Sequence, residues 1–144
     1  MPYRFLEDIA IADVAFEAWG ASLEEMFIAA ASATLRVMVD DLEAIDRREQ
    51  RTLHLEAEAV DMLLFQFLQE LVFFKDAERL LLLADSLAIQ RRGDDDWELT
   101  AAVYGEMIDP NRHELLVDVK AVTLYRFQVE TFDGGWKAVV VLDI

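Results

Sequence analysis

The chain has 144 residues, of which 55% are hydrophobic and 29% are charged. This length and composition are typical of a single domain, residues 1–144, that buries roughly 70% of its unfolded surface, so extended disorder is excluded. The longest uncharged run, residues 26–35, is far shorter than the roughly 20 apolar residues of a membrane-spanning helix, and the N-terminus has no apolar signal core. We therefore expect a soluble, cytoplasmic protein.

The charge balance is strongly acidic, with 13 lysines and arginines against 29 aspartates and glutamates and a formal net charge of −16. Such a surface repels phosphate backbones and anionic lipids, so we expect neither direct nucleic-acid binding nor membrane binding. A basic protein or a hard cation is the natural partner, unless the acidity only maintains solubility. Because the chain has no cysteine and only two histidines, disulfides, thiolate metal sites and histidine-rich metal clusters are excluded.

The first half of the sequence predicts two strands and two helices. The first element runs over residues 3–19, and its second half, 14–19, has the composition of a strand that ends at Gly20. Ser22 and Glu25 form a capping box, so a helix is predicted over about 23–39. After a charged connection, apolar and polar residues alternate over 51–57, which predicts a strand with His54 on its polar side. Residues 59–74 have a broad apolar stripe at helical spacing, which predicts a second helix.

The second half predicts mainly strands. Residues 80–90 and 97–106 flank a charged turn and form one hairpin, while 115–131 and 136–144 surround the turn at 133–135. The predicted fold class is therefore α+β, with two amphipathic helices packed on a mostly antiparallel sheet of about six or more strands.

Motifs for an enzyme are missing, because the sequence contains no phosphate-binding loop, dinucleotide fingerprint or nucleophile elbow. His113 lies in a polar connection and is expected to be solvated. The acidic tract 94–96 lacks the spacing of a calcium loop and is expected to be a solvated turn.

The C-terminus offers a denser group of carboxylates. With a turn at 133–135, Phe132 would lie opposite Trp136 and Tyr125 opposite Asp143, so that Asp143 continues the row of Val139 and Val141. That row has the composition of a core face, which would place Asp143 at the rim of the core. The terminal carboxylate of Ile144 follows at once. The Asp143 side chain and the terminal carboxylate would repel each other unless a cation or hydrogen-bond donors offset their charges. The alternative to such a site is a frayed terminus whose carboxylates are solvated.

Several segments, in register over the whole chain, resemble the archease family. They are 12–20 (ADVAFEAWG), 22–25 (SLEE), 64–71 (LFQFLQEL), 105–114 (GEMIDPNRHE), 120–123 (KAVT) and the final 143–144 (DI). The resemblance implies a protein cofactor, not an enzyme, that promotes guanylylation and multiple turnover of an RtcB-type RNA ligase in tRNA splicing. It also implies a metal site formed by Asp13, Asp143 and Ile144. Oxygen ligands suit calcium in the first place, with magnesium or manganese as alternatives.

The sequence departs from the family pattern at two histidines. Ala10 replaces the histidine of the family's D-H-T-A-D motif, and Tyr125 replaces the histidine that follows K-A-V-T. Both positions would fall near the predicted metal site, so metal affinity or the partner surface is expected to differ. Lys120 matches a family position, yet a strand lysine is usually a solvated charge.

Two rival functions stay open. One is a chaperone-like modulator of another tRNA-processing enzyme, such as a tRNA cytosine methyltransferase, a role that has also been suggested for archease-like proteins. The other is a metal-dependent hydrolase that uses the carboxylate cluster, although the sequence places no histidine base beside it.

Overall fold

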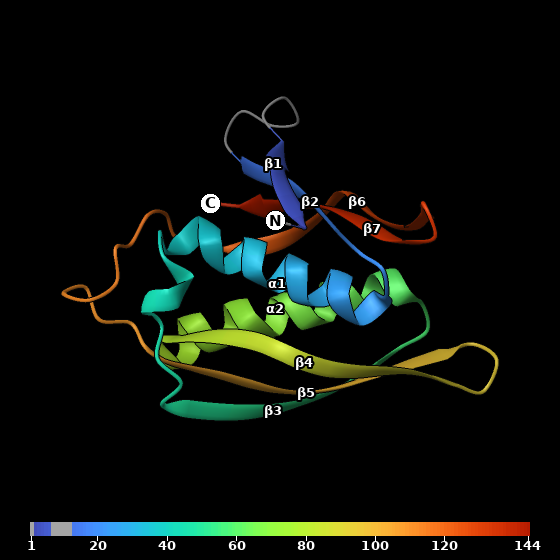
Figure 1. Cartoon of the computed structure of the whole chain (residues 1–144), viewed down its shortest axis with the longest axis horizontal. Helices are drawn as coiled ribbons and strands as arrows, with labels where there is room; N and C mark the ends of the chain where they lie inside the picture. The colour runs from blue at the N-terminus through green and yellow to red at the C-terminus, as the bar shows by residue number, and fades with distance from the viewer. Residues whose placement is uncertain (1, 7–12) are drawn as a thin grey trace.

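The computed structural model describes residues 2–6 and 13–144 of the chain. Two helices, α1 and α2, lie between a four-stranded and a three-stranded sheet, giving three layers (Figure 1). The predicted α+β class is confirmed, with the strands divided between two sheets instead of forming one. None of the described helices has the length and hydrophobicity needed to cross a bilayer.

The four-stranded sheet has the order β1-β2-β7-β6, and every neighbouring pair is antiparallel. Its strands are β1 (Tyr3–Leu6), β2 (Asp13–Gly20), β6 (Ala121–Phe132) and β7 (Gly135–Asp143). The first predicted element therefore forms two antiparallel strands. Because β7 lies between β2 and β6, the two ends of the chain meet in one sheet.

The three-stranded sheet has the order β3-β5-β4 and is also antiparallel. Its strands are β3 (Glu49–Ala57), β4 (Leu80–Arg92) and β5 (Asp96–Met107). The β4–β5 hairpin and its exposed acidic turn are as predicted. A short 3₁₀ helix, Leu42–Ala44, leads from α1 toward β3.

Helix α1 (Leu23–Met38) begins at the predicted capping box. The Ser22 hydroxyl accepts a hydrogen bond from Glu25 N, and the Glu25 carboxylate accepts one from Ala21 N. Most of the helix is buried, including four of its alanines at 3% exposure or less. A helix that is apolar on nearly all sides fits between two sheets, where both faces are covered.

Helix α2 (Val60–Glu78) is longer than predicted and ends at Arg79, whose φ of 55° is left-handed. Its predicted stripe, from Leu63 to Val72, lies in the core. The helix contacts β3, β4 and β5 on one side and β6 on the other.

The prediction of a strand from residue 115 is wrong, because β6 begins only at Ala121. Leu115 forms an isolated bridge with Val39, and the next two amides donate to carbonyls in the last turn of α1. The segment 115–117 therefore follows the end of α1 and leaves three apolar side chains partly exposed: Leu115, Leu116 and Val117.

Candidate functional site

Asp13 and Asp143 are direct partners in the β2–β7 ladder. Asp13 begins β2 and Asp143 ends β7, so antiparallel pairing brings the two carboxylates to one corner of the sheet although they are far apart in sequence. Directly opposed side chains in such a ladder have Cβ atoms about 4.5–5.5 Å apart. Both aspartates are half-buried. We call this corner, formed by Asp13, Asp143 and Ile144, the carboxylate corner.

Ile144 holds the end of the chain in place at the carboxylate corner. Its side chain is half-buried and packs against the hydrophobic core. Lys120 N donates a hydrogen bond of 2.8 Å to the Asp143 carbonyl, and Ala121 pairs with Asp143 on the β6 side. Strands on both sides therefore fix Asp143.

The carboxylate corner has no compensating cation within the described residues. No arginine, lysine or histidine among residues 2–6 and 13–144 forms an ion pair with Asp13, Asp143 or the terminal carboxylate. Like charges directly opposite in a sheet are destabilising. The carboxylates of Asp13 and Asp143, which lack a counter-charge among the described residues, have the donor chemistry that calcium, magnesium and manganese prefer.

The predicted pairing of Tyr125 with Asp143 is wrong. The turn is a two-residue Asp133-Gly134 turn with positive φ at both positions, so Phe132 pairs with Gly135. A bulge at 124–127 then shifts the register further and leaves Tyr125 more than half exposed. The β7 residues in the main core cluster are Ala138, Val140 and Leu142, so Asp143 lies in the alternate row, in which Val141 is also fully buried. Ala10, the other departure from the family pattern, lies outside the described residues.

A second polar group surrounds Glu106, at the start of the segment 105–114. Glu106 is buried and accepts hydrogen bonds from Arg112 and from Asp46 N, and it lies 3.1 Å from His113 Nε2. The Arg112 hydrogen bond, helped by Asp46 N and His113 and opposed by burial, lowers the Glu106 pKa to about 2. This network ties the connection after β5 to the connection before β3.

The expectation of a solvated His113 is wrong, because its side chain is fully buried. Its Nδ1 accepts a 2.9 Å hydrogen bond from Asp109 N, so its Nε2 carries the proton that faces Glu106. Both ring nitrogens are used, and the residue has a structural part in closing the loop. The residues next to His113 in the sequence are mostly polar and do not indicate that its side chain is buried.

Lys75, which no sequence motif marked, is a buried lysine on α2. Its ammonium donates to Asp118 at 2.6 Å and to the Val119 carbonyl at 2.7 Å. Burial acts to lower the Lys75 pKa, but hydrogen bonds and charge from Asp118 and Asp76 outweigh it and the pKa is raised. This contact fixes the segment that leads directly to Lys120 and the carboxylate corner.

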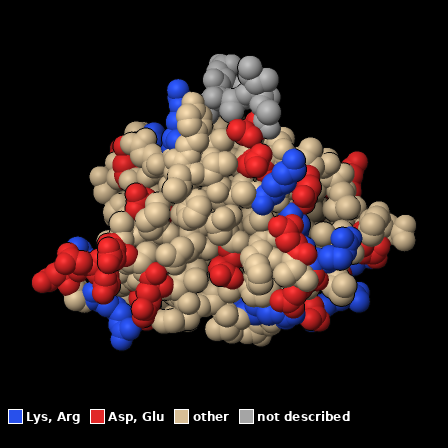
Figure 2. All heavy atoms as spheres, turned by 180° about the vertical axis from the view of Figure 1, so that it is seen from behind, with Lys and Arg blue, Asp and Glu red and all other residues tan. Residues whose placement is uncertain are grey.

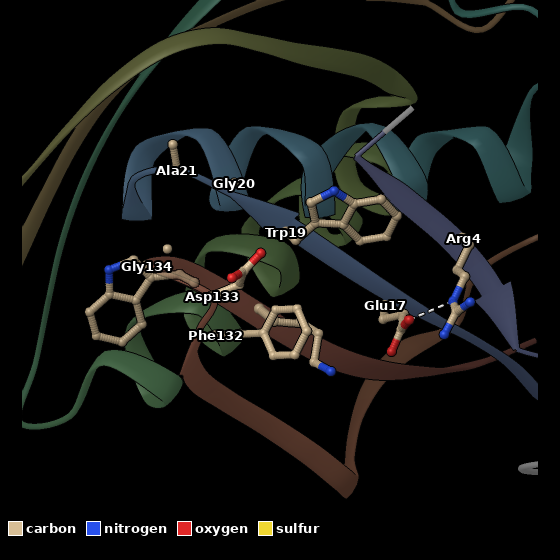
Figure 3. A pocket seen from close by; sticks show the side chains of 11 residues that line it. Arg4, Glu17, Trp19, Gly20, Ala21, Phe132, Asp133 and Gly134 are labelled. Atoms are coloured by element: carbon tan, nitrogen blue, oxygen red, sulfur yellow. Dashed lines mark hydrogen bonds and ion pairs between the residues drawn. The ribbon is translucent and has the colours of Figure 1, made fainter.

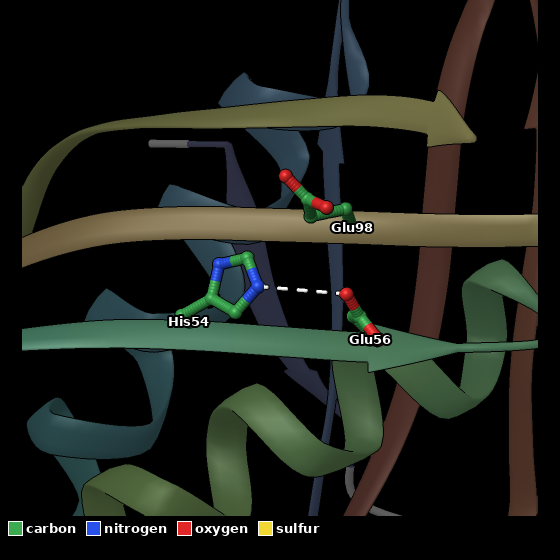
Figure 4. Close-up of side chains that lie close together, drawn as sticks. All are labelled: His54, Glu56 and Glu98. Atoms are coloured by element: carbon green, nitrogen blue, oxygen red, sulfur yellow. Dashed lines mark ion pairs between the residues drawn. The ribbon is translucent and has the colours of Figure 1, made fainter.

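The three-stranded sheet carries another cluster, formed by His54, Glu56 and Glu98 on neighbouring strands (Figure 4). His54 is exposed, as predicted. Arg92 Nη1 lies 2.8 Å from Glu98 Oε2 and 3.3 Å from Glu56 Oε1. Glu98 Oε2 lacks a well-aligned hydrogen bond, yet the nearby guanidinium balances its charge. One guanidinium therefore pairs with both glutamates, and ion pairs hold this cluster together.

Acidic side chains also dominate parts of the molecular surface. Figure 2 shows them gathered at the end of the molecule where the β4–β5 hairpin projects, while other regions mix both signs. The hairpin turn contains the exposed Asp94, Asp95 and Asp96, which form the solvated turn that the sequence predicted. The acidic excess is thus partly concentrated at the β4–β5 turn.

Known proteins are similar to this chain over nearly its full length. The model of the Archease protein family matches residues 3–144. A protein archease of Pyrococcus abyssi is 36% identical over 92% of this chain and 93% of its own, and one of Methanopyrus kandleri is 33% identical over 100% of both. The solution structure of protein 1598 of Methanobacterium thermoautotrophicum is 35% identical and covers 99% of each chain with a TM-score of 0.84.

A second solved structure supports the fold alone. The crystal structure of an archease, possible chaperone, from Thermotoga maritima is 19% identical, covers 98% of each chain and has a TM-score of 0.62. The three-layer arrangement is therefore kept at low sequence identity.

Proposed function

Because the chain belongs to the archease family, we propose that it is a protein cofactor that promotes guanylylation and multiple turnover of an RtcB-type RNA ligase in tRNA splicing. The coarser role of a chaperone-like helper agrees with the description of the Thermotoga maritima relative as a possible chaperone. The observation that carries the proposal is the direct pairing of Asp13 with Asp143, which assembles the residues that the family resemblance implies for metal binding.

The proposed cofactor of this protein is a divalent cation, calcium in the first place. Asp13, Asp143 and the terminal carboxylate of Ile144 would hold it, and the cation would supply the positive charge that the carboxylate corner lacks. The residues of the chain fix the geometry, since Lys120 N and two neighbouring strands hold Asp143. Magnesium or manganese would fit the same oxygen ligands with fewer protein contacts.

A role as a cofactor and not as an enzyme is supported by where the two histidines lie. His113 lies in the connection after β5, buried against Glu106, and His54 lies on β3 of the three-stranded sheet. The carboxylate corner therefore has no imidazole for general-base chemistry. The acidic surface also favours a partner that is basic because it holds RNA.

The proposal is tested by measuring guanylylation of the cognate ligase with GTP and a divalent cation, with and without this protein. We expect a faster guanylylation step and repeated turnover at substoichiometric amounts of this protein. An unchanged rate and turnover would overturn the proposal. Association with a tRNA cytosine methyltransferase, without any effect on the ligase, would instead favour the chaperone-like alternative.

A further inference from the structure

Two neighbouring hollows meet at the end of β2 that lies away from the carboxylate corner. They have volumes of about 530 and 580 Å³, which are in the range of ligand sites, and both are lined by Trp19, Gly20 and Ala21. The β6–β7 turn closes against this end of β2, since a Cβ on Gly135 would lie 2.3 Å from the Gly20 carbonyl oxygen. Trp19, 37% exposed, separates the two hollows.

The first hollow combines aromatic side chains with a free carboxylate (Figure 3). Trp19 and the more than half exposed Phe132 both line it, and Asp133 lines the same hollow. Glu17 is already paired with Arg4. Asp133 forms no ion pair with any of the described basic side chains, so it is the acidic group available to an incoming cation.

The same hollow already holds one cation on an aromatic ring. Lys137 Nζ lies 4.3 Å from the centroid of the Phe132 ring and 4.0 Å from Glu130 Oε1. Aromatic faces attract cations, and a planar guanidinium can also stack on them and pair with a carboxylate. The chemistry of this hollow therefore suits an arginine side chain.

The second hollow is mainly apolar. Its walls include Tyr3 from β1, Ile28 from α1 and Leu42 from the 3₁₀ helix. Its acidic residue, Glu25, accepts a hydrogen bond from Ala21 N within the capping box. An aliphatic side chain is the occupant that such walls favour.

We propose that the two hollows together bind a basic protein segment, with an arginine side chain in the first and a neighbouring aliphatic side chain in the second. The net charge of −16 favours the approach of a basic partner, and Asp133 with the aromatic rings gives the arginine a specific position. The length of β2 from Asp13 to Gly20 places this surface roughly 20 Å from the carboxylate corner, so the proposal does not rest on metal binding or on the ligase.

The test uses N-acetyl-leucyl-arginine amide as the probe and the citrulline peptide, which has the same shape but no charge, as its control. Binding is followed by the NMR signals of the three tryptophan indoles. We expect saturable shifts of Trp19 and Trp136, which line the first hollow, and none of Trp97, which lies on the other sheet. Citrulline should bind roughly two- to fivefold more weakly. Equal binding of the two peptides, equal movement of Trp97 or no saturable shift would overturn the proposal.

Variants test the two charged groups of the first hollow. Asp133→Asn keeps a residue type that tolerates the left-handed turn and should weaken arginine binding roughly two- to fivefold, whereas Asp94→Asn on the other hairpin should leave it unchanged. Lys137→Gln removes the cation on Phe132 and should strengthen it. Unchanged binding in both Asp133→Asn and Lys137→Gln would overturn the proposal even if the peptide binds.

Discussion

Asp13, the first residue of β2, lies directly opposite Asp143, the last residue of β7, and this contact joins the two ends of the chain. The pairing uses a position where a sheet normally avoids two like charges. The effect of this pairing on the free energy of unfolding depends on whether a cation is bound. The carboxylate corner can therefore be tested by measuring stability as well as cation binding.

Asp143→Asn should stabilise the metal-free protein and weaken calcium binding. Removing one of two opposed charges relieves a repulsion of about 0.2–1 kcal/mol, while the loss of a charged ligand should reduce calcium affinity roughly tenfold or more. Thermal unfolding with chelator and calorimetric titration with calcium measure the two effects, and Asp94→Asn is the matched control. Wild-type calcium affinity in both Asp13→Asn and Asp143→Asn would place any cation elsewhere.

Extending the chain by one residue beyond Ile144 should cause part of the same loss. The added residue converts the terminal carboxylate of Ile144 into a neutral amide and removes one charged oxygen ligand. We expect weaker calcium binding and weaker ligase stimulation together, with the melting temperature in chelator unchanged or raised. Full calcium affinity in the extended protein would show that the terminal carboxylate is not a ligand.

Glu106 should make the stability of the protein depend on acidity. Its pKa falls from the ordinary 4.5 to about 2 in the folded state, so its stabilising contribution is complete above pH 4.5 and is lost as the pH falls toward 2. Glu106→Gln should destabilise the protein by about 1–3 kcal/mol at pH 7, because Arg112 loses its buried charged partner and keeps only Asp46. Denaturant unfolding should show this difference shrinking between pH 4.5 and 2. If the difference in unfolding free energy between wild type and Glu106→Gln did not change with pH, the lowered pKa of Glu106 would be contradicted.

Lys75→Met should loosen the segment before β6. The substitution leaves Asp118 and the Val119 carbonyl without their shared donor, at a cost of about 1–3 kcal/mol. The Lys75 pKa is raised in the folded state, so its contribution is complete below pH 10.5 and is lost only above it. Hydrogen exchange at residues 118–121 should rise in the variant, while exchange in β3 stays unchanged as the internal control.

Association with the ligase should weaken as salt concentration rises. Exposed complementary charges are screened beyond about 8 Å at physiological ionic strength. A series of affinities between low and high salt, measured with wild-type protein, tests this dependence. An affinity that does not change with salt would point to a mainly apolar interface.

The sequence by itself determined the elements whose signals are local. The capping box of Ser22 and Glu25 placed the start of α1, because both partners lie within one turn. Alternation and turn residues likewise placed β3 and the β4–β5 hairpin. The family resemblance named Asp13 and Asp143, but no local pattern indicated that their strands would pair.

Only the tertiary structure decided how the strands are divided and registered. The two-residue turn at Asp133-Gly134 and the bulge at 124–127 displaced Tyr125 from Asp143, since each changes which residues pair without changing the apolar pattern. Burial of His113 and Lys75 also depends on partners distant in sequence. Helix caps and turns are determined within a few residues, whereas strand partners, sheet division and buried charge pairs are determined by which surfaces exclude water together.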